Sequence, residues 1–123
     1  MSSRSDIRWV LCYLLLRSAL EYANLISEKL LAGLPAEAVW LFGSHARGEA
    51  TPDSDMDFLA VVPHSGESRY RRAVSARRLV RDIHGPKDII VLTKEEWDRE
   101  LQVPSSLSST VKKEGVRLDH GPC

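Results

Sequence analysis

The stretch Leu41-Phe-Gly-Ser-His-Ala-Arg-Gly-Glu-Ala-Thr-Pro-Asp-Ser-Asp-Met-Asp-Phe-Leu-Ala-Val-Val62 decides how the rest of this sequence is interpreted. It begins inside a short apolar run, 38–42, passes through a turn-rich segment, 43–53, and enters a second apolar run at Met56. Short apolar runs bounded by glycine and proline are typical of buried strands. We therefore predict two strands, 38–42 and 56–62, joined by an irregular connection.

Helices and a third strand are expected around this pair. The segment from Ile7 to about Leu31 contains neither glycine nor proline, which predicts a long N-terminal helix. The patterns further predict a helix over 68–83, a strand over 88–93 and a helix over 94–101. A helical turn and a short edge strand are expected near the C-terminus, over 110–114 and 116–120. This order of elements is typical of an α/β (α+β) domain, with helices packed on a small mixed sheet.

The two halves of the predicted N-terminal helix differ in character. The first half is apolar nearly all round, which can be explained by a partner protein, by a homodimer, or by burial under the C-terminal segment. The second half is amphipathic, and Ser27 lies away from its apolar face. The members of that face are Leu16, Ala19, Leu20, Ala23, Ile26 and Leu30.

Length and composition indicate one globular domain. The chain has 123 residues, of which 43% are hydrophobic and 28% are charged. We expect a single domain over 1–123, made of an N-terminal helical segment, 1–33, and a core, 36–123. Lys and Arg together number 17, as do Asp and Glu. No overall field therefore favours nucleic acid or an anionic membrane.

Membrane and redox signals are weak. The apolar run 7–16 contains Arg8 and is shorter than the about 20 residues that a spanning helix needs. Cys12 and Cys123 do not have the spacing of a disulfide framework or a zinc site. We therefore expect a cytoplasmic protein that makes no membrane contact.

Paired carboxylates at the start of the second strand are the main chemical signal. Asp55 and Asp57 are two residues apart, so they project to the same side of a strand. Two such carboxylates repel each other unless a cation lies between them, and their hard oxygens suit magnesium or manganese. Asp88 opens the next strand and is the candidate for a third ligand. Together they predict a two-metal site for phosphoryl or nucleotidyl transfer.

The Gly43-Ser44 pair leaves the first strand into a turn. Glycine allows the backbone to approach a ligand closely, and free amides at a helix start bind phosphate oxygens. Arg47 could contact a triphosphate or pair with a neighbouring acidic residue, and we keep both interpretations. His45 could approach the nucleotide or lie exposed in the loop.

The segment Gly43-Ser-His-Ala-Arg-Gly-Glu-Ala-Thr-Pro-Asp-Ser-Asp-Met-Asp57 resembles the signature of the minimal nucleotidyltransferases, which belong to the DNA polymerase beta-like superfamily. In that family the Gly-Ser pair holds the nucleotide phosphates, two aspartates bind two magnesium ions, and a third binds the metal that activates the attacking hydroxyl. The resemblance implies a fold like the polymerase beta nucleotidyltransferase core and ATP as the donor. It assigns these roles to Gly43, Ser44, Asp55, Asp57 and Asp88.

The short chain leaves little room for an acceptor-binding domain. The resemblance extends to MntA-like antitoxins, which act beside a helical HEPN ribonuclease toxin and transfer AMP from ATP to a tyrosine hydroxyl of that toxin. Two alternatives stay open. The protein could neutralise a toxin by binding alone, or it could modify a small molecule of the aminoglycoside type.

An arginine cluster falls within the predicted helix 68–83. It could be a solvated helix face, or it could contact an acidic partner or RNA held by that partner. Tyr70 is the one aromatic residue among these arginines, so direct binding of single-stranded nucleic acid is not expected. We expect Trp9, Trp40 and Trp97 to lie in the core or at an interface rather than to stack on bases. The cluster consists of Arg69, Arg71, Arg72, Arg77, Arg78 and Arg81.

Overall fold

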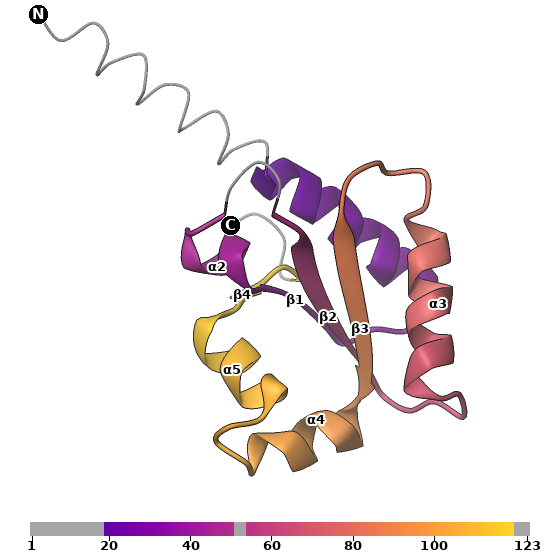
Figure 1. Cartoon of the computed structure of the whole chain (residues 1–123). Coiled ribbons are helices and arrows are strands. Elements are labelled where there is room, and N and C mark those ends of the chain that lie inside the picture. Colours follow the sequence, from indigo (N-terminus) through magenta and orange to yellow (C-terminus); the bar gives the residue numbers. More distant parts are fainter. Residues whose placement is uncertain (1–18, 51–53, 120–123) are drawn as a thin grey trace, which may run out of the picture.

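The computed structural model describes residues 19–50 and 54–119. The first half of the predicted N-terminal helix and both cysteines lie outside the described residues. A four-stranded sheet with the order β3-β2-β1-β4 forms the centre of the described part (Figure 1). β2 pairs with β3 in parallel and with β1 antiparallel, and β1 also pairs antiparallel with β4. The strands are β1 (Ala38–Phe42), β2 (Met56–Val62), β3 (Lys87–Thr93) and β4 (Val116–Arg117).

Helices cover both faces of this sheet. The helix over 19–33 and α3 pack on one face, while α4 and α5 lie on the other (Figure 1). The labelled helices are α2 (Ser44–Arg47), α3 (Arg69–Leu79), α4 (Lys94–Leu101) and α5 (Leu107–Glu114). The predicted α+β class with a small mixed sheet is confirmed. Within the described ranges, no helix is both long enough and apolar enough to cross a membrane.

Two cores follow from the alternation of side chains along β2. Phe58 and Ala60 point into the core beneath the 19–33 helix and α3, where Ile26 and Leu30 are fully buried. Leu59 and Val61 point into the second core, which lies beneath α4 and α5. β2 is therefore buried on both faces, which explains its continuous apolar sequence.

One prediction about the N-terminal helix is wrong in detail. Leu20, expected on the apolar face, is 49% exposed, whereas Ser27, expected on the polar side, is only 2% exposed. The two residues are seven positions apart and therefore lie on the same side of the helix, so their position along the helix decides which is covered. Ser27 lies between the buried Ile26 and Leu30, whereas Leu20 lies near the start of the described part of the helix.

Most element boundaries agree with the sequence, and the differences have local causes. α3 ends at Leu79 rather than at residue 83, because Val80 leaves the helical region and residues 80–83 form a turn. α5 begins at Leu107, earlier than expected, because the Ser106 hydroxyl accepts a hydrogen bond from the Ser109 amide and caps the helix. The helix α2 was not predicted as a separate element.

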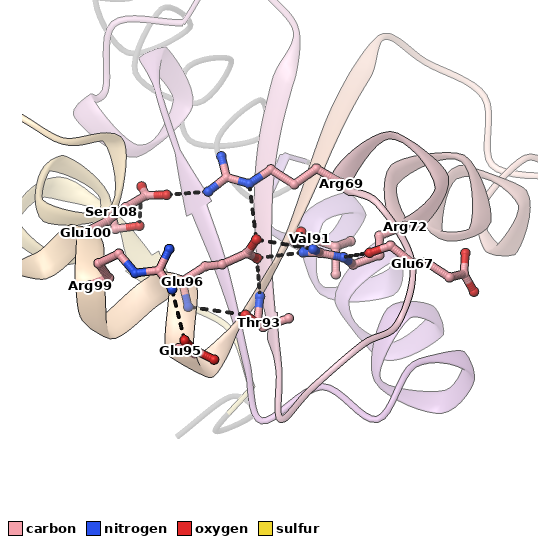
Figure 2. Close-up of polar contacts among 10 residues, drawn as sticks. All are labelled: Glu67, Arg69, Arg72, Val91, Thr93, Glu95, Glu96, Arg99, Glu100 and Ser108. Carbon is pink, nitrogen blue, oxygen red and sulfur yellow. Dashed lines mark hydrogen bonds and ion pairs between the residues drawn. The ribbon is translucent and has the colours of Figure 1, made fainter.

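A polar cluster fastens α3 and α4 to the sheet (Figure 2). Arg72 is 9% exposed and donates to the Val91 carbonyl at 2.8 Å and to Glu96 Oε1 at 2.7 Å. Thr93 and Glu96 form a capping box at the start of α4, because each side chain accepts a hydrogen bond from the other residue's amide. The hydrogen bonds from Arg72, opposed by desolvation, lower the pKa of Glu96 to about 2.

A tryptophan pair joins α4 to the sheet on the same side. The rings of Trp40 in β1 and Trp97 in α4 stack with their centroids 5.8 Å apart. Both residues therefore belong to the core, as the sequence predicted.

Candidate active site

The strand register brings two predicted site residues together. Asp57 in β2 is the lateral neighbour of Asp88 in β3, and on its other side it lies opposite Phe42 in β1. Neighbours in register project to the same face, so the two carboxylates lie side by side. That face is the one covered by α4 and α5, because Leu59 and Leu92 point into the same core.

Asp55 completes the acidic end of the sheet. It is exposed and lies just before β2, two residues from Asp57. Burial raises the pKa of Asp57 above its ordinary value of 3.8, and the charges of Asp88 and Asp55 raise it further. His45 and Arg47 act in the opposite direction. The three carboxylates therefore interact electrostatically, as the sequence led us to expect.

Gly43 provides space beside these acids. Its φ of +80° lies in the left-handed region, and a Cβ at this position would meet Asp57 Oδ2 at 2.3 Å. Only glycine satisfies both conditions without strain. Gly43 is also the residue before α2. As a glycine it has no side chain that could cap that short helix. Its backbone and Ser44 thus lie next to the acidic end.

The structure shows contacts for the two loop residues whose roles the sequence left open. Arg47 Nε lies 3.3 Å from Glu49 Oε2, so in this structure it pairs with a neighbouring acid. His45 Nε2 lies 3.2 Å from the Ser54 carbonyl oxygen and ties the loop to the start of β2. A contact of Arg47 with nucleotide phosphates stays a prediction.

One residue at this end was not singled out from the sequence. Arg77 Nη2 on α3 lies 3.0 Å from Asp88 Oδ1. In the sequence Arg77 is one of several arginines with no distinguishing pattern. Its role depends on how α3 packs along β3, which no local signal reveals.

The donor set fits a hard divalent cation. Asp55, Asp57 and Asp88 offer carboxylate oxygens, which magnesium and manganese prefer over the softer donors of zinc sites. Burial and the charges of Asp88 and Asp55 raise the pKa of Asp57, and a bound cation would offset these effects. Within residues 19–50 and 54–119, however, no three acidic, histidine or cysteine side chains are already close enough to hold a metal ion. Closing the site would require side-chain rotation.

Two metal ions held by carboxylates can stabilise the attacking and leaving oxygens in displacement at phosphorus. Residues 24–118 match the nucleotidyltransferase domain, and the chain belongs to this family of transferases. Members generally use a nucleoside triphosphate and a divalent metal. The family assignment therefore agrees with the site that the strand register assembles.

A solved structure agrees with this assignment. The crystal structure of a "putative nucleotidyltransferase" from Sulfolobus solfataricus is 30% identical in sequence and superposes with a TM-score of 0.63. The similarity covers 86% of this chain and 84% of that one. Among curated protein sequences, no significant match was found.

Proposed function

We propose that the protein transfers AMP from ATP, with magnesium, to a tyrosine hydroxyl of a HEPN-type toxin and so acts as its antitoxin. The observation that supports this proposal best is the pairing of Asp57 with Asp88 next to Gly43. Residues 24–118 are accounted for by the nucleotidyltransferase domain, so this part of the chain brings no separate acceptor domain. The hydroxyl would then arrive on another molecule.

Each site residue has a role in this proposal. Asp55, Asp57 and Asp88 would hold two magnesium ions, which supply charge neutralisation at the triphosphate and lower the pKa of the attacking hydroxyl. Gly43 leaves room for a phosphate close to the backbone, and the Ser44 hydroxyl would donate to a phosphate oxygen.

The reaction is an in-line substitution at phosphorus. The acceptor oxygen forms a bond to the α-phosphorus of ATP as the bond to the bridging oxygen breaks, and pyrophosphate leaves. The acceptor hydroxyl loses its proton to the surrounding solvent. Asp57 must be ionised for its role, and bound magnesium would favour that state.

Mass spectrometry of the candidate partner tests the proposal. A HEPN-type protein, if one is encoded beside this chain, would be incubated with the purified protein, ATP and magnesium. We expect a mass increase of one or more AMP units on the partner. The variant Asp55→Asn with Asp57→Asn should reduce the rate by about a thousandfold or more. Asp98→Asn, on α4 and paired with Lys94, is the matched control and should retain activity.

Absence of labelling on the partner would contradict the proposed acceptor. If labelled nucleotide appeared instead on an aminoglycoside or another small hydroxyl compound, the chemistry would hold and the acceptor would change. Transfer that persists in the double variant would remove Asp55 and Asp57 from the mechanism.

A second candidate function is neutralisation by binding alone. The observation that favours it is on the 19–33 helix, where Leu20 and Leu25 are 49% and 45% exposed although both are large and apolar. These side chains could contact a toxin or a second copy of this chain. In cells, a binding antitoxin would still protect when it carries the double aspartate substitution, whereas a catalytic antitoxin would not.

A further inference from the structure

The acidic end of the sheet contains an arginine contact that the proposed function does not use. Arg77 Nη2 and Asp88 Oδ1 are 3.0 Å apart, and the two side chains are 60% and 52% exposed. Arg77 lies on α3, which packs against the opposite face of the sheet through Ala76. β3 is an edge strand, and α3 lies beside it (Figure 1). The guanidinium therefore reaches round the edge of the sheet to Asp88.

The contact with Arg77 distinguishes Asp88 from the other two carboxylates in the described part of the chain. Within the described residues, Arg77 is the cation that bonds one of the acids Asp55, Asp57 and Asp88. Arg47 acts on Asp57 only through its field, because its own contact is with Glu49. Among residues 19–50 and 54–119, Arg77 thus supplies the one positive charge bonded directly to the acidic end.

We propose that the guanidinium of Arg77 competes with a divalent ion for the Asp88 carboxylate. In the metal-free protein Arg77 forms an ion pair with Asp88, and the ion must displace it in order to bind. This inference rests on the proposed function, because it assumes that Asp88 is a metal ligand. A guanidinium carries only donors and cannot itself coordinate a metal. A divalent ion that binds Asp57 and Asp88 therefore approaches a fixed positive charge, which repels it.

The exposure of the pair makes this competition reversible. A solvent-exposed ion pair contributes little net stability, so a divalent ion with several ligands can displace the guanidinium. The competition nevertheless weakens the affinity of the metal-free protein for the ion. Arg77 would then set the concentration of divalent ion at which the site fills.

Binding of Mn²⁺ to the whole chain without nucleotide is the direct test. Free Mn²⁺ would be measured by electron paramagnetic resonance for wild type, Arg77→Ala, Arg77→Lys and Arg78→Ala. Arg78 is an exposed neighbour on α3, so it controls for the loss of one positive charge nearby. Removing a charge this close to the ion should tighten binding by about three- to tenfold in Arg77→Ala at low salt.

The other variants define the mechanism. Arg78→Ala should stay within about twofold of wild type, because its charge is farther away and screened. Arg77→Lys keeps the charge and should remain near wild type. In EDTA, Arg77→Ala and Arg78→Ala should melt at similar temperatures, because an exposed ion pair contributes little net stability. At the same limiting concentration, Mn²⁺ should raise the melting temperature of Arg77→Ala more than that of Arg78→Ala.

Two results would overturn the inference. Equal tightening in Arg77→Ala and Arg78→Ala would show a general charge effect. Weaker Mn²⁺ binding in Arg77→Ala would show that Arg77 positions Asp88 for the ion rather than competing with it. The proposed function fails separately, if wild-type binding of Mn²⁺ is unchanged by Asp57→Asn. If neither wild type nor Arg77→Ala binds Mn²⁺, both ideas fail.

Discussion

Carboxyl groups at the two ends of the β2–β3 pair have pKa values shifted in opposite directions. Near Thr93, Glu96 is bonded by Arg72, and its pKa falls to about 2 (Figure 2). At the other end, burial and the charge of the neighbouring Asp88 raise the pKa of Asp57. The first arrangement stabilises the ionised carboxylate, while the second opposes it. The end near Thr93 therefore stabilises the fold. The acidic end carries excess negative charge, which a bound cation can neutralise.

The strongest test of this comparison is a substitution at the acidic end. Asp57→Asn should reduce nucleotidyl transfer by about a thousandfold, because a metal ligand is lost. The free energy of unfolding should not fall, since a carboxylate with a raised pKa is removed. Transfer kinetics and urea unfolding measure the two effects. A large loss of stability would show that Asp57 supports the fold rather than the site.

The opposite response is expected at the other end. Arg72→Ala leaves Glu96 and the Val91 carbonyl without their donor, which should lower the free energy of unfolding by about 3 kcal/mol. Arg71→Ala, on an exposed neighbour, is the control and should change it by no more than about 0.5 kcal/mol. Equal effects of the two substitutions would mean that the buried ion pair is not what joins α3 to α4.

The glycine turn gives a smaller effect with a close control. Gly43→Ala combines a φ of +80° with a Cβ placed 2.3 Å from Asp57 Oδ2, and it should cost about 2 kcal/mol as well as activity. Gly48→Ala has a φ of +74° but meets nothing within 4 Å. It should cost about 1 kcal/mol and leave transfer unchanged. If both variants lose equal stability, the contact with Asp57 contributes nothing beyond backbone strain.

The smallest expected effect is a pH dependence. The pKa of Glu96 is about 2 in the folded protein against an ordinary 4.5, so its ion pairing stabilises the fold above about pH 4.5. This contribution is lost as the pH falls towards about 2. Glu96→Gln removes the titrating carboxyl but keeps a residue that can form the capping box. The free energy of unfolding should therefore fall less steeply between about pH 5 and about pH 3 than in wild type.

Glu95→Gln provides the comparison for that measurement. Glu95 lies in the same first turn of α4, but its side chain is 82% exposed. Its substitution should leave the pH profile of unfolding close to that of wild type. A profile for Glu96→Gln that still falls as steeply as wild type would mean that another group causes the acid sensitivity.

Much of the fold could be predicted from local patterns. The bounds of β1 and β2 were predicted correctly, because apolar runs next to glycine and proline are strong signals. The start of α4 was also predicted correctly, because Thr93 and Glu96 form a capping box, which is another local signal. Contacts between elements were harder. Nothing in the sequence showed that Arg72 would be buried while Arg71, its immediate neighbour, would be exposed.

The candidate site divides in the same way. Asp55, Asp57 and Gly43 belong to one continuous motif, so sequence spacing was enough to propose them. Asp88 was proposed because it opens the next strand, and the β2–β3 register places it beside Asp57. Arg77 could not be found, because its contact depends on the packing of α3 along the edge of the sheet.

The stacked pair Trp40 and Trp97 has a consequence for experiments on the whole chain. Two indole rings with centroids 5.8 Å apart couple their electronic transitions and give a circular dichroism signal that neither ring has alone. Because one ring belongs to β1 and the other to α4, the signal reports whether α4 is seated on the sheet. β1 ends at Phe42, directly before Gly43, so the strand that carries Trp40 also leads into the acidic end. A change in this signal on adding nucleotide and metal would therefore reveal that events at the acidic end alter the packing of α4.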